Sequence, residues 1–208
     1  MKKILKVTAL LLVAAAMFAG CANSSSSSDD DKGSNGVKDA AKEAALFKES
    51  DVTETFTYST STKLADGDWT LSFIGVTDRG ETAPGYKQEK TETEVAEFTI
   101  SESGTKATFT KFVESYIETT TSLNGNITGE AKAQAEAAGC TVSGNKAIFR
   151  NDIEKTEAEL KSMSIDYVNN NIEHASKTNS DKTKIYGEES GTDSKGRPYT
   201  IKLYVMKK

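Results

Sequence analysis

Hydrophobic and polar residues alternate along most of this chain, and alternation with a period of two predicts β-strands. We expect one face of each strand to be buried and the other to contact solvent. In the segment 199–206, the predicted buried face carries Tyr199, Ile201, Leu203 and Val205. The same pattern predicts nine strands, at residues 53–60, 68–76, 92–101, 106–118, 140–143, 146–150, 161–168, 183–189 and 199–206.

Turn residues join several of these strands. Gly144-Asn145 suits a two-residue hairpin turn with positive φ, and residues 102–105 suit a slightly longer turn. Between these hairpins, the alanine-rich stretch 129–138 predicts a short helix that ends at Gly139. We therefore expect a mainly β fold, an antiparallel meander of about eight or nine strands that forms a barrel or a curved sandwich, with one or two short helices.

The N-terminal residues have a different pattern, in which a basic start leads into an apolar run. Lys2, Lys3 and Lys6 supply the positive charge, and the apolar run follows at residues 9–17. This run is shorter than the ~20 apolar residues that a membrane-spanning helix needs. The pattern predicts a cleaved export signal over residues 1–20.

The residues at the end of this signal are Phe18-Ala19-Gly20-Cys21, and they resemble the lipobox of bacterial lipoproteins, with Phe18 where the family usually has leucine. The resemblance implies that Cys21 is the lipid attachment site and the first residue of the mature chain. Each buried methylene of an acyl chain contributes about 0.8 kcal/mol, so two or three chains would anchor the protein firmly in a membrane. The resemblance also implies the outer rather than the inner membrane of a bacterial cell envelope, because Ala22, and not aspartate, follows the cysteine. An ordinary export signal followed by a chance cysteine is the alternative.

Beyond the signal, the sequence divides into three segments. Residues 21–36 combine the lipidated cysteine with a Ser- and Asp-rich tether that has no large apolar side chain, and we expect the tether to be disordered. Residues 37–50 predict a short amphipathic helix, and residues 51–208 a single β-rich domain. The acidic run 29–31 lacks the alternate ligand spacing of a calcium loop.

Charge and cysteine content narrow the expected partners. The formal charge of the whole chain is -5, and removing the three lysines of the signal brings it to about -8. Because the charge is negative and no basic block occurs, we do not expect nucleic acid as a partner. Lipidation of Cys21 would leave Cys140 alone, so we expect a small buried thiol there and no intramolecular disulfide.

The sequence contains no group of residues that predicts catalysis, a metal site or a cofactor. His174 is the only histidine, and we expect it on the surface. The glycine spacing of 139–144 resembles that of a phosphate loop, but Asn145 stands where the lysine is needed. No G-x-S-x-G element occurs. We therefore expect no enzymatic activity; an envelope hydrolase would need a constellation that we do not find.

Gly67-Asp68-Trp69 opens a strongly apolar segment and resembles the G-x-W motif of lipocalins. Asp166-Tyr167 resembles the family's second motif, T-D-Y, with Ile165 in place of threonine. The resemblance implies that Trp69 plugs one end of a barrel beneath a late arginine, here Arg197, and that the interior binds small hydrophobic molecules. The alternative is that Trp69 is the largest core residue of an unrelated β-domain.

Together these features predict a cell-envelope lipoprotein that presents a β-domain and binds a small hydrophobic ligand. The alternative is a surface adhesion module that contacts a protein or a glycan and has a filled core. A closed cavity of several hundred Å³ would favour the first function, and a core filled by side chains would favour the second.

Overall fold

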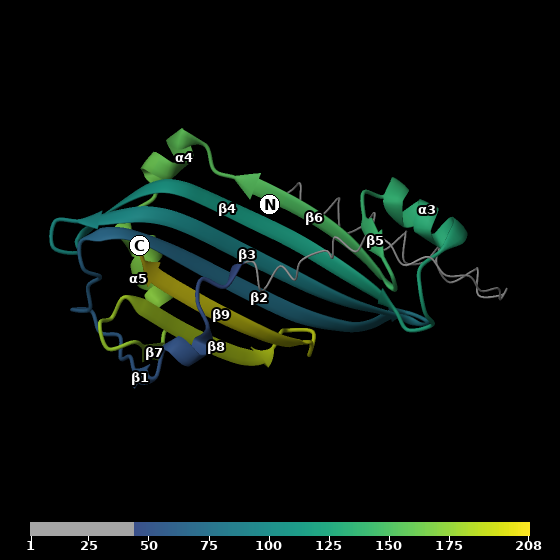
Figure 1. Cartoon of the computed structure of the whole chain (residues 1–208), viewed down its shortest axis with the longest axis horizontal. Coiled ribbons are helices and arrows are strands. Elements are labelled where there is room, and N and C mark those ends of the chain that lie inside the picture. Colours follow the sequence, from purple (N-terminus) through teal and green to yellow (C-terminus); the bar gives the residue numbers. More distant parts are fainter. Residues whose placement is uncertain (1–43) are drawn as a thin grey trace. The chain divides into compact units, whose positions relative to one another are not determined.

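Nine antiparallel strands form one sheet in the part of the chain that the structure describes (Figure 1). The computed structural model describes residues 44–208, and the strands follow the order β1-β7-β8-β9-β2-β3-β4-β6-β5. The strands are β1 (Glu54–Thr55), β2 (Gly67–Ala83), β3 (Tyr86–Ser101), β4 (Lys106–Ser122), β5 (Thr141–Ser143), β6 (Lys146–Glu154), β7 (Lys177–Thr178), β8 (Lys184–Thr192) and β9 (Pro198–Lys207).

The sheet is open, because β1 and β5 stand at its two ends and do not pair with each other. These edge strands have only two and three residues. They offer too few backbone hydrogen bonds to close a barrel, and such short edges also discourage pairing with other chains. The predicted mainly β, antiparallel meander is confirmed, whereas the closed-barrel form of that prediction is wrong.

Most predicted strands are confirmed, although several are longer than expected. β2 and β3 continue to a tight turn at Pro84-Gly85, where Gly85 has a φ of 79°. The predicted hairpin turns are present, with Gly144 at a φ of 57° and Gly104 at 78°. By contrast, the predicted strand 53–60 is reduced to the two residues of β1.

Three α-helices occur among residues 44–208: α3 (Gly129–Ala137), α4 (Glu157–Ser162) and α5 (Ile165–Ile172). α3 is the predicted alanine-rich helix, and Gly139 follows it in a left-handed conformation. The other two helices replace the predicted strand 161–168, which is wrong.

Local capping explains why residues 157–172 are helical. The Thr156 hydroxyl accepts a hydrogen bond from the Glu159 N–H, and the Glu159 carboxylate accepts one from the Thr156 N–H. Ser164 caps α5 by accepting from the Asp166 N–H. Such caps satisfy backbone donors that a strand would have to pair elsewhere, so the helical spacing of Val168 and Ile172 prevails over the short alternation.

The structure consists of two compact units, and β2, β3, β4 and β6 contribute residues to both. One unit contains residues 78–90 and 117–150, with a small core formed by Ile127, Ala135 and Ala147. The other contains residues 44–77, 91–116 and 151–208 and has a much larger core. In that core, Val168 and Ile172 of α5 pack on the sheet against Trp69, Leu71, Phe98, Ile100, Phe112, Ile185, Leu203 and Val205.

The opposite face of the sheet is also covered, by the segment that begins at residue 44. Only the last part of the predicted helix 37–50 lies within the described residues: Ala44 is helical, and a 3-10 turn follows at Glu49–Asp51. Phe47 packs edge-on against Tyr204, with ring centroids 5.3 Å apart. Tyr204 is therefore 4% exposed, although it alternates with the core residues of β9. The expectation that this strand has one solvent-facing side is wrong at this position.

Candidate functional site

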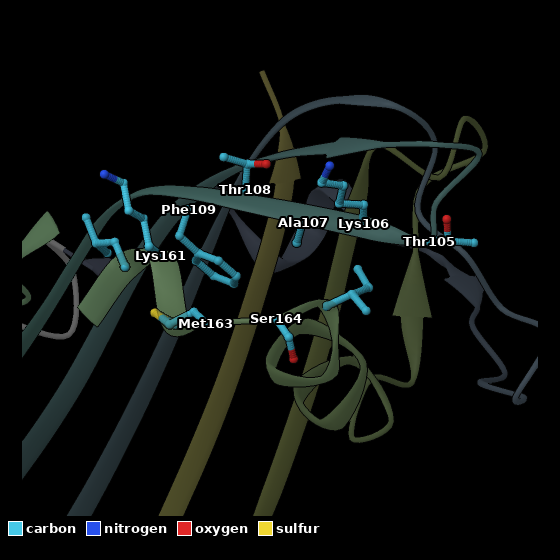
Figure 2. Close-up of a pocket in the computed structure, with 10 residues that line it drawn as sticks. Thr105, Lys106, Ala107, Thr108, Phe109, Lys161, Met163 and Ser164 are labelled. Carbon is cyan, nitrogen blue, oxygen red and sulfur yellow. The ribbon is translucent and has the colours of Figure 1, made fainter. Parts of the chain in front are cut away.

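A surface groove of about 390 Å³ lies beside the first residues of β4 (Figure 2). All of its lining residues belong to the unit with the large core. One wall is β4, and the other is the segment that joins α4 to α5. The lining residues are Thr105, Lys106, Ala107, Thr108 and Phe109 on the first wall, and Leu160, Lys161, Met163, Ser164 and Ile165 on the second.

The groove exists because β6 is shorter than β4. The Lys155 N–H, just after the end of β6, donates to the carbonyl oxygen of Phe112 at 2.9 Å. Beyond this pair the chain turns into α4 at Thr156, so among residues 44–208 no strand continues beside residues 106–111. β4 therefore has a free edge along this stretch.

The direction of the backbone along this edge follows from the core contacts. Phe112 faces the large core and directs its carbonyl toward the β6 side of β4. On a strand, the face that a side chain occupies and the side to which its N–H and C=O point alternate together, and the two consecutive exposed residues Thr110 and Lys111 indicate one extra residue in β4 that shifts both by one position. Ala107 and Phe109 pack on the same core, so their N–H and C=O groups point to the same side, the free edge of β4 that borders the groove.

The floor of the groove is apolar. Phe109 is 7% exposed, and its ring contacts Phe98 and Tyr167 with centroid distances of 5.3 and 5.8 Å. Ala107, Leu160, Met163 and Ile165 are partly buried against the same core. Figure 2 shows Ala107 and Phe109 on the side of β4 that faces the α4–α5 segment, with Lys106 and Thr108 directed the other way.

The charged side chains that line the groove are both cationic. Lys106 forms an ion pair with Glu102 at 3.2 Å, and Lys161 pairs with Glu157 at 2.6 Å. All four side chains are largely exposed, so each pair contributes little and exchanges readily for another anion. The groove thus combines an apolar floor, backbone hydrogen-bonding groups and a weakly held positive charge.

Beside the groove, Glu94 and Tyr167 form a partly buried hydrogen bond. The Tyr167 hydroxyl donates to Glu94 Oε2 at 2.7 Å. Burial raises the pKa of Glu94, and the carboxylate of Glu114 raises it further. Burial, followed by the charge of Glu94, also raises the pKa of Tyr167. The Lys155 ammonium lies 3.6 Å from Glu114. The raised pKa favours the protonated form of the Glu94 carboxyl group. The hydrogen bond to Glu94 positions Tyr167 under the groove.

The structure does not bring Trp69 and Arg197 together. Trp69 is 1% exposed in the large core, lies opposite Lys207 in the β2–β9 pair, and donates from Nε1 to the Ala65 carbonyl at 2.8 Å. Arg197 precedes the other end of β9, roughly 30 Å away along an extended strand. Its Nε donates to Asp193 at 2.7 Å and helps to lower the pKa of Asp193 to about 2. The arrangement of a late arginine over the tryptophan is therefore not formed.

A buried ion pair in the smaller-core unit was not predicted from the sequence. Arg79 Nη1 lies 2.7 Å from Glu118 Oε1 and also donates to Gln88 at 3.2 Å. The Glu118 side chain is fully buried. The sequence around Glu118 does not predict its burial, because the ion pair joins residues that are 39 positions apart in the chain. The pair joins β2 to β4 across the intervening strand β3, on which Gln88 lies.

The other candidate residues, His174 and Cys140, lie at the surface and beside the small core, respectively. The His174 side chain is 59% exposed, as predicted, with Glu173 and Glu189 at 3.7 and 3.9 Å. Cys140 is half-buried beside the small core, and burial raises the pKa of its thiol. Across residues 44–208, no group of three or more histidines, cysteines or acids is arranged to hold a metal ion. Cys21 and the acidic run 29–31 lie outside the described residues.

The α4–α5 wall of the groove is not predicted from the sequence, because the short alternation of residues 161–168 predicts a strand there. The sequence nonetheless contains a signal for α4, since Thr156 and Glu159 have the spacing of a capping box.

No family model, no curated protein and no solved structure matches this chain. Within residues 44–208, no helix is long and apolar enough to cross a membrane.

Proposed function

We propose that this chain is a bacterial cell-envelope lipoprotein, anchored through acyl chains on Cys21, whose domain 51–208 is a non-enzymatic interaction module. The anchor rests on the export-signal pattern of residues 1–20 and on the small residues before Cys21. The outer membrane is the proposed location, since Ala22 follows the cysteine.

One observation favours an interaction module over a barrel with a central ligand: the space between the sheet and α5 is filled by side chains. Trp69, Phe98, Phe112 and Ile172 occupy this space and are at most 2% exposed. A hollow of about 390 Å³ in this unit, the groove beside β4, lies instead at the surface. Such a position suits recognition of an external partner, a protein or a glycan.

A small hydrophobic ligand is the second candidate, and the same groove supports it. Its volume of about 390 Å³ lies within the ~300–1,000 Å³ typical of ligand sites. Phe109 and Met163 would supply the apolar contacts. In this candidate the ligand lies on the surface of the domain and not in a plugged barrel.

Anchoring is tested by Cys21→Ser in the source bacterium, or in a host that lipidates exported proteins. We expect loss of labelling by a palmitate analogue and release of the protein from the membrane fraction. Cys140→Ser is the matched control and should keep both properties. Unchanged labelling and membrane partitioning of the Cys21→Ser protein would refute the anchor.

Native mass spectrometry of the protein, extracted from its own envelope in mild detergent, separates the two candidate functions. An interaction module should show only the mass of the lipidated chain. A reproducible added mass below about 1 kDa, lost in Phe109→Ala but kept in Leu123→Ala, would favour the small ligand. Leu123 is a suitable control because it is exposed and does not line the groove.

A further inference from the structure

We propose that the groove beside β4 binds an extended peptide segment of a partner protein, which adds to the sheet as a strand and carries acidic residues that alternate with apolar ones. This inference rests on the proposed function as an interaction module and names the partner's chemistry. It follows from three properties of the groove: its backbone edge, its floor and its charge.

The backbone edge provides the main recognition. Ala107 and Phe109 direct their N–H and C=O groups to the free edge of β4, which borders the groove, and β6 no longer pairs with β4 beyond Phe112. A peptide that lies along residues 105–109 can form backbone hydrogen bonds to both residues, as in other complexes that extend a sheet. Five residues of strand span about 16 Å at about 3.3 Å per residue, so a peptide of five or six residues fits the edge.

The two faces of the added strand meet different surroundings, which sets the sequence of the peptide. Its core-side residues would lie over Phe109 and against Met163 and Ile165, where apolar side chains are favoured. Its other residues would stand beside Lys106 and Thr108, the neighbours on the far face of β4 (Figure 2). A strand that alternates apolar and polar residues satisfies both faces.

The positive charge of the lysines that line the groove favours acidic residues at the polar positions of the peptide. Both charged side chains that line the groove are lysines, Lys106 and Lys161, and no acid lines it. Their present partners are exposed glutamates on neighbouring turns, so an incoming carboxylate can replace them at little cost. A glycan has no backbone amides to pair with the edge of β4, so the backbone edge favours a peptide.

The test uses the full-length lipidated protein in detergent micelles and a synthetic library of acetylated, amidated hexapeptides. The library alternates Glu, Lys or Ser with Val, Leu or Thr, and binding is measured by fluorescence anisotropy. We expect the tightest members to have Glu at the polar and Leu or Val at the apolar positions. N-methylation of alternate backbone amides on the edge-facing side should weaken binding by at least 10-fold, because it removes the strand hydrogen bonds.

Two substitutions in the protein test the location. Ala107→Pro removes the N–H that points to the free edge of β4, where proline is tolerated. We expect at least 10-fold weaker binding, whereas Ala107→Val, which keeps the N–H, should bind within about 3-fold of the parent protein. Lys161→Glu should weaken the Glu-containing peptides and not the Ser-containing ones, and Lys182→Glu, outside the groove, should change neither. The fluorescence of Trp69, the only tryptophan, reports whether each variant is folded.

The proposal is overturned if no library member binds, if N-methylated peptides bind as well as their parents, or if folded Ala107→Pro binds as well as Ala107→Val. A failure of this kind leaves membrane anchoring through Cys21 intact, since that property is measured by acyl labelling. Conversely, a protein that binds acidic peptides at the groove but is not acylated would refute the anchor alone.

Discussion

Replacing Tyr167 with phenylalanine isolates the hydrogen bond that positions this residue under the groove. The ring keeps its edge-on contacts with Phe109 and Phe112, at 5.8 and 5.4 Å, while the 2.7 Å bond to Glu94 is lost. A hydrogen bond to a charged group contributes about 1.5–3 kcal/mol, and one to a neutral group about 0.5–1.5 kcal/mol. We expect Tyr167→Phe to lower the free energy of unfolding by about 2 kcal/mol at a pH above the raised pKa of Glu94, where its carboxylate is charged.

Glu94→Gln removes the charge and keeps an acceptor for the hydroxyl. In this background Tyr167→Phe should cost only about 1 kcal/mol, because the lost bond is then to a neutral amide. The double-mutant cycle should therefore give a coupling of about 1 kcal/mol at a pH above the raised pKa of Glu94. Chemical denaturation followed by the fluorescence of Trp69, which is 1% exposed, measures each free energy.

The pH dependence of Glu94→Gln has a definite sign. Burial raises the pKa of Glu94 in the folded state above its ordinary value of 4.5. The protonated carboxyl therefore favours the folded state below pH 4.5, and this stabilisation is lost as the pH rises through the raised pKa. The stability of Glu94→Gln relative to the parent protein should increase with pH across that range. Equal costs of Tyr167→Phe in both backgrounds, or a pH-independent effect of Glu94→Gln, would refute the reasoning.

Two further substitutions test the packing on the sheet of α5 and of the residues that follow it. Ile172→Ala should lower the free energy of unfolding by about 2–5 kcal/mol, measured by denaturation, since Ile172 is completely buried and holds α5 on the sheet; a loss below about 1 kcal/mol would contradict that placement. Gly187→Ala should cost about 1–3 kcal/mol, because its Cβ would overlap the His174 carbonyl oxygen and lie 3.0 Å from Ala175 Cα. Gly75→Ala is the control and should be nearly neutral, since its nearest neighbour would be 3.5 Å away, and equal effects of the two substitutions would contradict this account.

Local sequence predicts an element well where its own residues supply the stabilising contacts. The hairpin at Gly144 depends on a two-residue turn with positive φ, and both the turn and its strands are confirmed. The segment 161–168 fails because its alternation is short, and the capping residues Thr156 and Ser164 determine its structure instead. For such a segment, capping is stronger evidence than a period seen over a few residues.

Long-range packing explains the other differences. Tyr204 is buried because residues 44–47, far away in the sequence, cover the outer face of β9. Trp69 is a core residue, as its size predicts, but the position of Arg197 depends on the β2–β9 register and separates the two residues. The sequence of a single strand does not determine its register, because the register is set by pairing with a distant strand.

The sequence by itself determined the mainly β class, most strand positions, the hairpin turns and the alanine-rich helix, since alternation and turn chemistry act over a few residues. Only the tertiary structure decided that the sheet stays open, that both of its faces are covered near Tyr204, and that β4 has a free edge beside α4 and α5. The groove arises where β6 stops opposite Phe112, and that point is set by the register that pairs Phe112 with Lys155, 43 residues later in the chain.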